Sequence, residues 1–321
     1  MTFPINRFSE ITALVVGDVM IDAYLWGDIE RQSPEAPVPV LLKSGKDSRI
    51  GGAGNVARNV LAMGAKAHLA TVIGNDISGK YLQKILIEKR IGTRAVITEH
   101  ARTTTVKTRI IKGTEHMLRI DEETTEQIIE ETRENLKNQI SSLLDSENID
   151  VIIVEDYDKG VMSPELASFL IEHANSKGIP ITVDPKLKNF EAYKGATLFK
   201  PNLNELKEGL GLEVDPNDLS SLQIATDKLN QTLQAQISLT TLGSDGMVIN
   251  AGGNLTHVSA TIRNVVDVSG AGDTVIAVAS LMLALGESPE NIAKASNIAG
   301  GQVCEKSGVV TVDLNELSSE F

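Results

Sequence analysis

The sequence has one cysteine, few aromatic residues and fewer basic than acidic side chains. Because Cys304 is alone among 321 residues, the chain can form no internal disulfide and no Cys-rich metal site. The 30 Lys and Arg against 43 Asp and Glu give a net charge of −13, which disfavours nucleic acid and anionic membranes as partners. The five histidines show no metal-ligand spacing, which argues against a zinc site.

Targeting signals are also missing. The N-terminal residues contain no basic segment followed by a long apolar run, and no uncharged stretch approaches the length of a membrane span. Together with the single cysteine, this predicts a cytoplasmic globular protein.

Short Val- and Ile-rich runs alternate with longer helical patterns, which is typical of βαβ units. Nearly continuous apolar strands are buried on both faces, so they indicate a mainly parallel sheet with helices on either side. We therefore expect an α/β fold with ligands at the carboxyl ends of its strands. The predicted strands are Ile11–Gly17, Ala67–Gly74, Val151–Val154, Ile181–Asp184, Ala196–Lys200 and Ile237–Leu242.

Two segments, approximately residues 20–43 and 102–121, interrupt this rhythm. The first carries strands spaced by prolines, and the second reads as a hairpin that turns at residues 112–114. We expect them to form a small β-sheet lid within a single domain that spans residues 1–321. Because a lid sheet has free edges that another chain can cover, we also expect a homodimer built through the lids.

Residues 267–274 read Asp-Val-Ser-Gly-Ala-Gly-Asp-Thr and lead into an almost wholly apolar helix. Glycines allow an anion to approach the backbone closely, and the amides of Gly270, Ala271 and Gly272 can point at it. Asp273 in the first helical turn can take a proton from an attacking hydroxyl. The alternative is a Gly-rich turn with an Asp that caps a helix, and the spacing leaves both interpretations open.

A second glycine cluster occupies residues 51–55, which read Gly-Gly-Ala-Gly-Asn at the start of a helix. The glycines do not follow the G-x-G-x-x-G spacing of a dinucleotide site. Gly52 fits close backbone approach to a sugar, and Asn55 can both donate and accept hydrogen bonds. Tight helix packing is an equally good explanation of these glycines.

Asn202 and Glu205 follow the predicted strand at residues 196–200. The simpler interpretation is a capping box, in which the two side chains bond the first backbone amides of a helix. Glu205 would nevertheless lie at the carboxyl edge of the sheet, where hydrated Mg²⁺ accompanying ATP needs oxygen ligands.

Several cations are placed to reach the same edge of the sheet. Strand alternation puts Lys107 and Arg109 on one face of the hairpin, and Lys159 and Lys186 follow two predicted strands. In an acidic protein, such a group of cations predicts a phosphorylated substrate. A solvated edge strand defended by charge is the alternative for Lys107 and Arg109.

Taken in order along the chain, these motifs resemble those of the PfkB carbohydrate kinases, which have a ribokinase-like fold. The matching positions are Gly17, Asp18 and Asp22, residues 51–55, Asn202 with Glu205, residues 241–246, and residues 267–273. Within the family, the chain is most similar to bacterial heptose 7-phosphate kinases. This similarity lies in residues 17–22, 33–40, 156–160, 184–186 and 195–202.

The resemblance implies transfer of the ATP γ-phosphate to the anomeric hydroxyl of D-glycero-β-D-manno-heptose 7-phosphate, which gives the 1,7-bisphosphate for ADP-heptose synthesis. It makes Asp273 the base and assigns the developing negative charge to the amides of Gly270, Ala271 and Gly272. Asp18, Asp22, Gly52 and Asn55 would bind sugar hydroxyls. Thr241, Gly243, Ser244, Gly246 and Asn297 would bound the nucleotide.

The resemblance also implies cofactors, with Asn202 and Glu205 organising phosphates and Mg²⁺, Glu205 through water, and Asp267 near a K⁺ ion. Many heptose kinases carry a C-terminal adenylyltransferase, whereas this chain stops at Phe321, so we expect a kinase only. Asp158 and Lys200 depart from the heptose kinase pattern. The alternatives are a PfkB kinase for an unphosphorylated sugar or nucleoside and a non-catalytic sugar-binding protein.

Overall fold

The computed structural model describes residues 3–113, 115–261 and 263–321. Within these residues the larger sheet has nine strands, and the smaller sheet has four. The order across the larger sheet is β13 (Asn254–Val258), β12 (Met247–Ala251), β11 (Ile237–Thr241), β10 (Leu198–Phe199), β9 (Ile181–Asp184), β8 (Val151–Glu155), β1 (Thr12–Gly17), β4 (Lys66–Gly74) and β5 (Gly92–Glu99). Neighbours from β11 to β5 run parallel, and β12 and β13 add an antiparallel edge.

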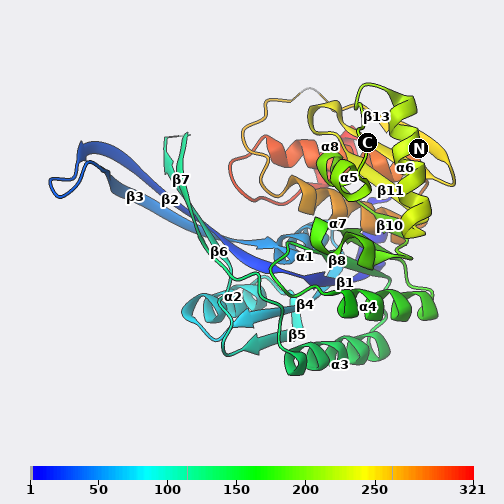
Figure 1. Ribbon diagram of the computed structural model, residues 1–321, viewed down its shortest axis with the longest axis horizontal. Coiled ribbons are helices and arrows are strands. Elements are labelled where there is room, and N and C mark those ends of the chain that lie inside the picture. The colour runs from blue at the N-terminus through cyan, green and yellow to red at the C-terminus, as the bar shows by residue number, and fades with distance from the viewer. Residues whose placement is uncertain (1–2, 114, 262) are drawn as a thin grey trace.

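Helices cover both faces of this sheet because its strands are apolar on both sides (Figure 1). One face packs against α1 (Ala53–Ala62), α2 (Ile77–Glu88), α7 (Ala271–Ala284), α8 (Pro289–Cys304) and α9 (Leu314–Glu320). The other packs against α3 (Glu130–Ser146), α4 (Pro164–Lys177), α5 (Leu203–Leu210) and α6 (Leu219–Leu233). The predicted α/β architecture is confirmed. Among the described helices, none combines the length and apolar character needed to cross a bilayer.

The smaller sheet has the order β3 (Pro39–Gly52), β2 (Val19–Gln32), β6 (Val106–Lys112) and β7 (Glu115–Glu122), and it projects from the body as an arm (Figure 1). Both segments that interrupt the βαβ rhythm lie in this sheet. The first continues beyond residue 43, because β3 pairs with β2 as far as Gly52 and runs directly into α1. Of the predicted hairpin turn, Thr114 lies outside the described residues.

The chain leaves β1 in one direction to reach β4 and later returns to place β8 on the other side, so the carboxyl ends of β1 and β8 meet at a topological switch point. Gly17 ends β1 there, with a φ of +152°, and a Cβ at this position would lie 1.9 Å from the carbonyl oxygen of Glu155. Only glycine permits this close approach of the ends of β1 and β8.

Three strands, β5, β12 and β13, were not predicted from the sequence. The acidic stretch at residues 121–134 predicts the start of a helix, but β7 continues to Glu122 and α3 begins only at Glu130. Pairing of β7 with β6 takes precedence over local helical pattern, which leaves residues 123–129 as an irregular connection.

Candidate active site

Asp273 lies in the first turn of α7 and is 2% exposed. Its Oδ2 accepts a hydrogen bond from Nδ2 of Asn55 at 2.8 Å, and its Oδ1 accepts one from the hydroxyl of Tyr157 at 2.8 Å. Burial raises the pKa of Asp273 to about 6, although the two hydrogen bonds act in the opposite direction. Asn55 is therefore placed to orient this carboxylate.

The glycine turn before α7 has the geometry of an anion site, with one difference from the sequence prediction. Gly270 is the N-cap with a φ of +79°. The Ala271 amide donates to the carbonyl of Val268 at 3.2 Å, so it is already engaged. The Gly272 and Asp273 amides have no acceptor among the described residues. The expected trio of free amides is thus corrected at Ala271, because the turn uses that amide to close itself.

Asp18 follows β1 and is 1% exposed. Its carboxylate accepts hydrogen bonds from the backbone amides of Tyr157 at 2.9 Å, Lys159 at 3.1 Å and Val161 at 3.0 Å. Burial, followed by the neighbouring Asp156, raises its pKa to about 6. Asp18 therefore fixes the loop after β8, because each of its oxygens accepts at least one backbone amide of that loop.

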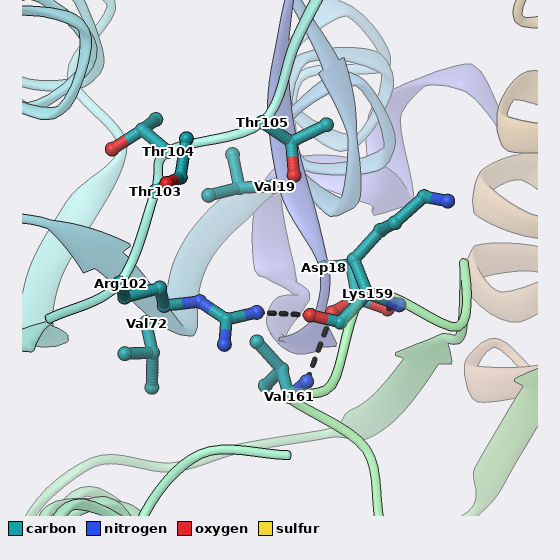
Figure 2. A pocket seen from close by; sticks show the side chains of 9 residues that line it. All are labelled: Asp18, Val19, Val72, Arg102, Thr103, Thr104, Thr105, Lys159 and Val161. Atoms are coloured by element: carbon teal, nitrogen blue, oxygen red, sulfur yellow. Dashed lines mark hydrogen bonds between the residues drawn. The ribbon is translucent and has the colours of Figure 1, made fainter. Parts of the chain in front are cut away.

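Arg102 holds the same loop from the other side. Figure 2 shows its guanidinium pointing at the carbonyl of Lys159, to which it donates a hydrogen bond, while the Val161 amide reaches Asp18. The cavity between these residues has a volume of about 10 Å³, which is room for a single water rather than a substrate. In the same view the Lys159 side chain runs away from Arg102. Asp18 and Arg102 thus hold the loop between them, and the Lys159 ammonium lies on the side of the loop away from Arg102.

The smaller sheet contributes Asp22, which pairs in register with Lys107 on β6. Arg109, two residues further along β6, forms an ion pair with Oδ1 of Asp22. Both side chains are largely buried, at 5% exposed for Asp22 and 13% for Arg109. The cation predicted to bind substrate is therefore paired with the carboxylate predicted to bind a sugar hydroxyl.

Lys107 and Lys159 come from different parts of the chain and meet at one carboxylate. Glu123 Oε2 lies 2.8 Å from the Lys107 ammonium, and Glu123 Oε1 lies 2.8 Å from the Lys159 ammonium. Asp121 also approaches Lys107, at 3.4 Å. The structure therefore brings together two of the predicted substrate cations and adds Glu123, which the sequence prediction missed.

Lys186, by contrast, lies with the predicted nucleotide residues. Its ammonium pairs with Oε1 of Glu205 and stands 5.6 Å from the centre of the Tyr157 ring. Asn202 and Glu205 form the capping box of α5, with both reciprocal bonds at 2.9 Å. The capping interpretation is thus confirmed. Glu205 also pairs with Lys186, which lies beside Tyr157, the residue that donates a hydrogen bond to Asp273.

A buried group of charges ends the neighbouring strands β8, β9 and β10. Lys200 Nζ pairs with Asp184 Oδ2 at 2.8 Å, with side chains only 4% and 9% exposed. Glu155 stands beside Asp184 in register, and its Oε2 is buried without a hydrogen-bond partner among the described residues. Burial, then the carboxylates of Asp184 and Asp273, raises the pKa of Glu155 well above its ordinary value. A Cβ on Gly272 would lie 3.6 Å from Asp184, so this group adjoins the α7 turn.

The fit of Mg²⁺ can be tested on this group. Among the described residues, no set of three or more His, Cys, Asp or Glu side chains is arranged to hold a metal directly. Mg²⁺ usually keeps several waters and is held by one or two carboxylates and by substrate phosphates. The unpartnered oxygen of Glu155, with Asp184 and Glu205 nearby, fits that looser mode.

The other predicted nucleotide residues cluster along β11 and beyond. Thr241 forms a parallel bridge with Asn202, and its amide donates to the carbonyl of Pro201 at 3.2 Å. The 3-10 turn η3 (Gly243–Asp245) contains Gly243 and Ser244, and Gly246 follows it. Asn297 on α8 donates to the carbonyl of Ser259 at 2.8 Å. Gly246 has a packing reason of its own, because a Cβ there would lie 2.1 Å from the Val258 carbonyl oxygen.

Asp267, the predicted K⁺ residue, joins two loops near the start of α7. Its Oδ1 accepts from the Ser269 amide at 2.9 Å, and its Oδ2 accepts from the Gly308 amide at 2.8 Å. Although partial burial opposes it, these hydrogen bonds lower the pKa of Asp267. Asp267 is therefore an ionised carboxylate that fixes the approach to the anion turn.

Several residues of the site to which the sequence analysis gave no role share a signal. Glu155, Asp184 and Lys200 are polar residues at the ends of predicted strands, and the rule that ligands meet strand ends would have selected them. Tyr157 follows the same strand end as Glu155. Glu123 gave no such signal, because its position depends on where β7 ends.

The chain is similar to known proteins over nearly its whole length. The description "pfkB family carbohydrate kinase" matches residues 11–316. A protein named "Bifunctional protein HldE" from Desulfatibacillum aliphaticivorans is 41% identical over all of this chain and 65% of its own length. The protein of that name from Citrifermentans bemidjiense is 39% identical over 98% of this chain and 64% of its own. The chain thus spans just under two thirds of these curated relatives.

Two solved structures share the fold. Phosphofructokinase-2 from Escherichia coli in complex with potassium superposes with a TM-score of 0.79 at 19% identity, covering 96% of this chain and 97% of that one. Arabidopsis thaliana ribokinase with ribose and ATP gives a TM-score of 0.72 at 16% identity, covering 96% and 98%. At these identities the likeness concerns the fold alone.

Proposed function

Because the chain belongs to the pfkB family of carbohydrate kinases, we propose that it transfers the γ-phosphate of ATP to the anomeric hydroxyl of D-glycero-β-D-manno-heptose 7-phosphate. The observation that carries the kinase chemistry is a buried carboxylate, Asp273, held on both oxygens at the N-terminus of α7. The sequence similarity to heptose 7-phosphate kinases and the identity of about 40% to the bifunctional relatives support the sugar.

In this proposal Asp273 accepts the proton of the attacking hydroxyl. Asn55 and Tyr157 keep the carboxylate in one orientation, which places the base before the substrate arrives. The unengaged amide of Gly272 and the dipole of α7 stabilise negative charge on the transferring phosphoryl group. Transfer moves the phosphoryl group from the β-phosphate oxygen of ATP to the sugar oxygen and releases ADP.

Mg²⁺ bound with ATP would neutralise charge on the phosphates. Glu205, Asp184 and Glu155 are the residues that would hold its water shell, and Lys186 would contact phosphate oxygens beside them. Asn202, Thr241, Gly243, Ser244, Gly246 and Asn297 would bound the nucleotide. A solved neighbour is titled as a potassium complex, and Asp267 is the residue we propose near such an ion here.

The sugar is proposed to lie between the smaller sheet and α7, with Asp22, Gly52 and Asn55 at its hydroxyls. Its 7-phosphate would reach Lys107 and Lys159, with Arg109 beside them. The smaller sheet then acts as a lid within one kinase domain, and the protein works in the cytoplasm as a homodimer joined through these sheets.

A second candidate follows from one observation. Glu123 and Asp121 already neutralise the two lysines, and a site without net charge suits an unphosphorylated sugar or a nucleoside. The chemistry at Asp273 would be the same for either substrate.

The test is product analysis by ³¹P NMR after incubation with ATP, Mg²⁺ and the heptose 7-phosphate. We expect a new anomeric phosphate signal at the rate at which ADP forms. Asp273→Asn, which keeps the size and removes the base, should lower kcat by roughly 10²- to 10⁴-fold with substrate binding retained. ADP formation without the anomeric signal, or full turnover by Asp273→Asn, would contradict the proposal.

A further inference from the structure

Glu123 stands where the strand β7 has just ended and bridges two ammonium groups from different elements. Lys107 comes from β6 of the smaller sheet, and Lys159 comes from the loop after β8 of the larger sheet. Each Glu123 oxygen lies 2.8 Å from one ammonium, and the three side chains are only 14 to 23% exposed. The carboxylate therefore joins the smaller sheet to the body.

The surrounding charges make Glu123 the main partner of this pair. Lys107 also has Asp121 at 3.4 Å, but Asp121 is shared with Arg119 at 2.9 Å. Glu123 is the only ion-pair partner that Lys159 has among the described residues, since Asp18 accepts its backbone amide and not its ammonium. Without Glu123, the Lys159 ammonium would be partly buried and unpaired.

A phosphate monoester offers what the bridging carboxylate offers. It presents several acceptor oxygens to the same donors and carries nearly twice the negative charge. Two ammoniums that share one carboxylate are therefore spaced to share one phosphate. While Glu123 bridges them, however, each ammonium has a donor engaged by this carboxylate.

We propose that Glu123 acts as an internal substitute for the substrate's phosphate, holding Lys107 and Lys159 in the free enzyme and giving way when a sugar phosphate binds. This inference rests on the proposed function, in which those lysines receive the 7-phosphate. Because the Glu123 carboxylate must be displaced first, it weakens the binding of every anion. Only anions with enough charge to replace it bind well, so Glu123 sets specificity by competition.

The chain allows this displacement. Glu123 begins an irregular connection to α3, in which Glu126 is the next point of attachment to the body, through the bond from Arg102 to its carbonyl. Glu123 is 23% exposed, so rotation of its side chain toward solvent needs no movement of β7.

The experiment measures binding of inorganic phosphate to the full chain by titration calorimetry, without ATP or sugar. Glu123→Gln keeps the shape and removes the charge, and we expect it to lower the phosphate Kd by about tenfold or more. Glu122→Gln is the matched control, because it changes the net charge equally at the exposed neighbouring position. The phosphate Kd of Glu122→Gln should stay within threefold of that of the unmodified chain. In the Glu123→Gln background, the added substitutions Lys107→Ala and Lys159→Ala should abolish the gain in phosphate affinity.

Glu123→Asp is a further variant that controls for a folding defect, since it keeps the charge but cannot reach both ammoniums. Its phosphate Kd should fall between that of Glu123→Gln and that of the unmodified chain. Equal Kd values for Glu123→Gln and Glu122→Gln, or weaker phosphate binding by Glu123→Gln, would overturn the inference. An adventitious charge effect would appear in both variants alike.

A kinetic arm separates this inference from the proposed function. With the heptose 7-phosphate, Glu123→Gln should lower KM and leave kcat within about twofold. If the heptose 7-phosphate is turned over but its KM rises in Glu123→Gln, the competition fails and the function stands. If only an unphosphorylated sugar is turned over while phosphate still binds more tightly to Glu123→Gln, the function fails and the competition stands.

Discussion

The hydroxyl of Tyr157 donates a hydrogen bond to Oδ1 of Asp273 at 2.8 Å, and so links the loop after β8 to the first turn of α7. The other oxygen of Asp273 is held by Asn55 from α1. The base is thus fixed by two elements that are distant in the sequence. Because both bonds stabilise the ionised form, they limit the rise in pKa that burial causes.

The pH dependence of kcat/KM follows from this arrangement. Asp273 must be ionised to take a proton, and its pKa is about 6, so the rate should fall about tenfold per pH unit below pH 6. Tyr157→Phe removes a hydrogen bond that lowers this pKa, so the acid limb should move to higher pH. The backbone bond from residue 157 to Asp18 is unchanged by this substitution. A limb that stays in place or moves to lower pH would contradict the assignment of the base.

Stability should depend on Lys200. Lys200→Met leaves Asp184 buried without its cation, which should lower the free energy of unfolding by about 3 kcal/mol in urea denaturation. The exposed Lys194→Met serves as the control and should change it little.

The loss of unfolding free energy caused by Lys200→Met should also depend on pH. Burial already raises the pKa of Asp184 in the folded state, and removal of Lys200 raises it further. The folded chain then keeps the Asp184 proton where the unfolded chain has lost it. The deficit should therefore grow as pH rises from about 4 through the raised pKa. A deficit that shrinks with rising pH would contradict this account.

Asn202 allows the helix cap to be separated from nucleotide binding. Asn202→Ala removes the side chain that caps α5 and should cost about 1 kcal/mol of stability, read from thermal unfolding. Asn202→Asp keeps a good cap but places a negative charge near the phosphates, so it should raise the KM for ATP at nearly normal stability. If Asn202→Asp leaves the KM for ATP unchanged, Asn202 is a cap and nothing more.

The homodimer can be tested on exposed apolar residues of the smaller sheet, which include Leu42, Met117, Leu118 and Ile120. Leu118 is 58% exposed, and Leu118→Lys should shift the chain from dimer to monomer in small-angle scattering. Leu219→Lys, at a similarly exposed position on α6, should leave the dimer intact. A monomer before any substitution would contradict the predicted assembly.

The fold was predictable because the apolar runs of the central strands are long and regular. Ile181–Asp184 was predicted with its observed bounds, and the family resemblance is confirmed by the match over residues 11–316. The edge strands β12 and β13 were missed, since a short hairpin of mixed polarity gives little periodic signal.

The site was predictable in part. Asp273 and Asn55 lie in glycine-rich motifs that are easily recognised in the sequence. In the structure, Nδ2 of Asn55 donates a hydrogen bond to Asp273 at 2.8 Å. The pairing of Lys107 with Lys159 through Glu123 required knowing that β7 ends at residue 122, which only tertiary pairing decides. The backbone role of Asp18 had no sequence signal, because its partners are amides of a loop about 140 residues away.

The most direct test of the account compares kcat/KM for the heptose 7-phosphate with that for the same heptose without phosphate, under saturating ATP and Mg²⁺. Charge-assisted bonds from Lys107 and Lys159 should give the phosphorylated sugar an advantage on the order of 100-fold. Equal values, or a preference for the unphosphorylated sugar, would contradict the proposed substrate.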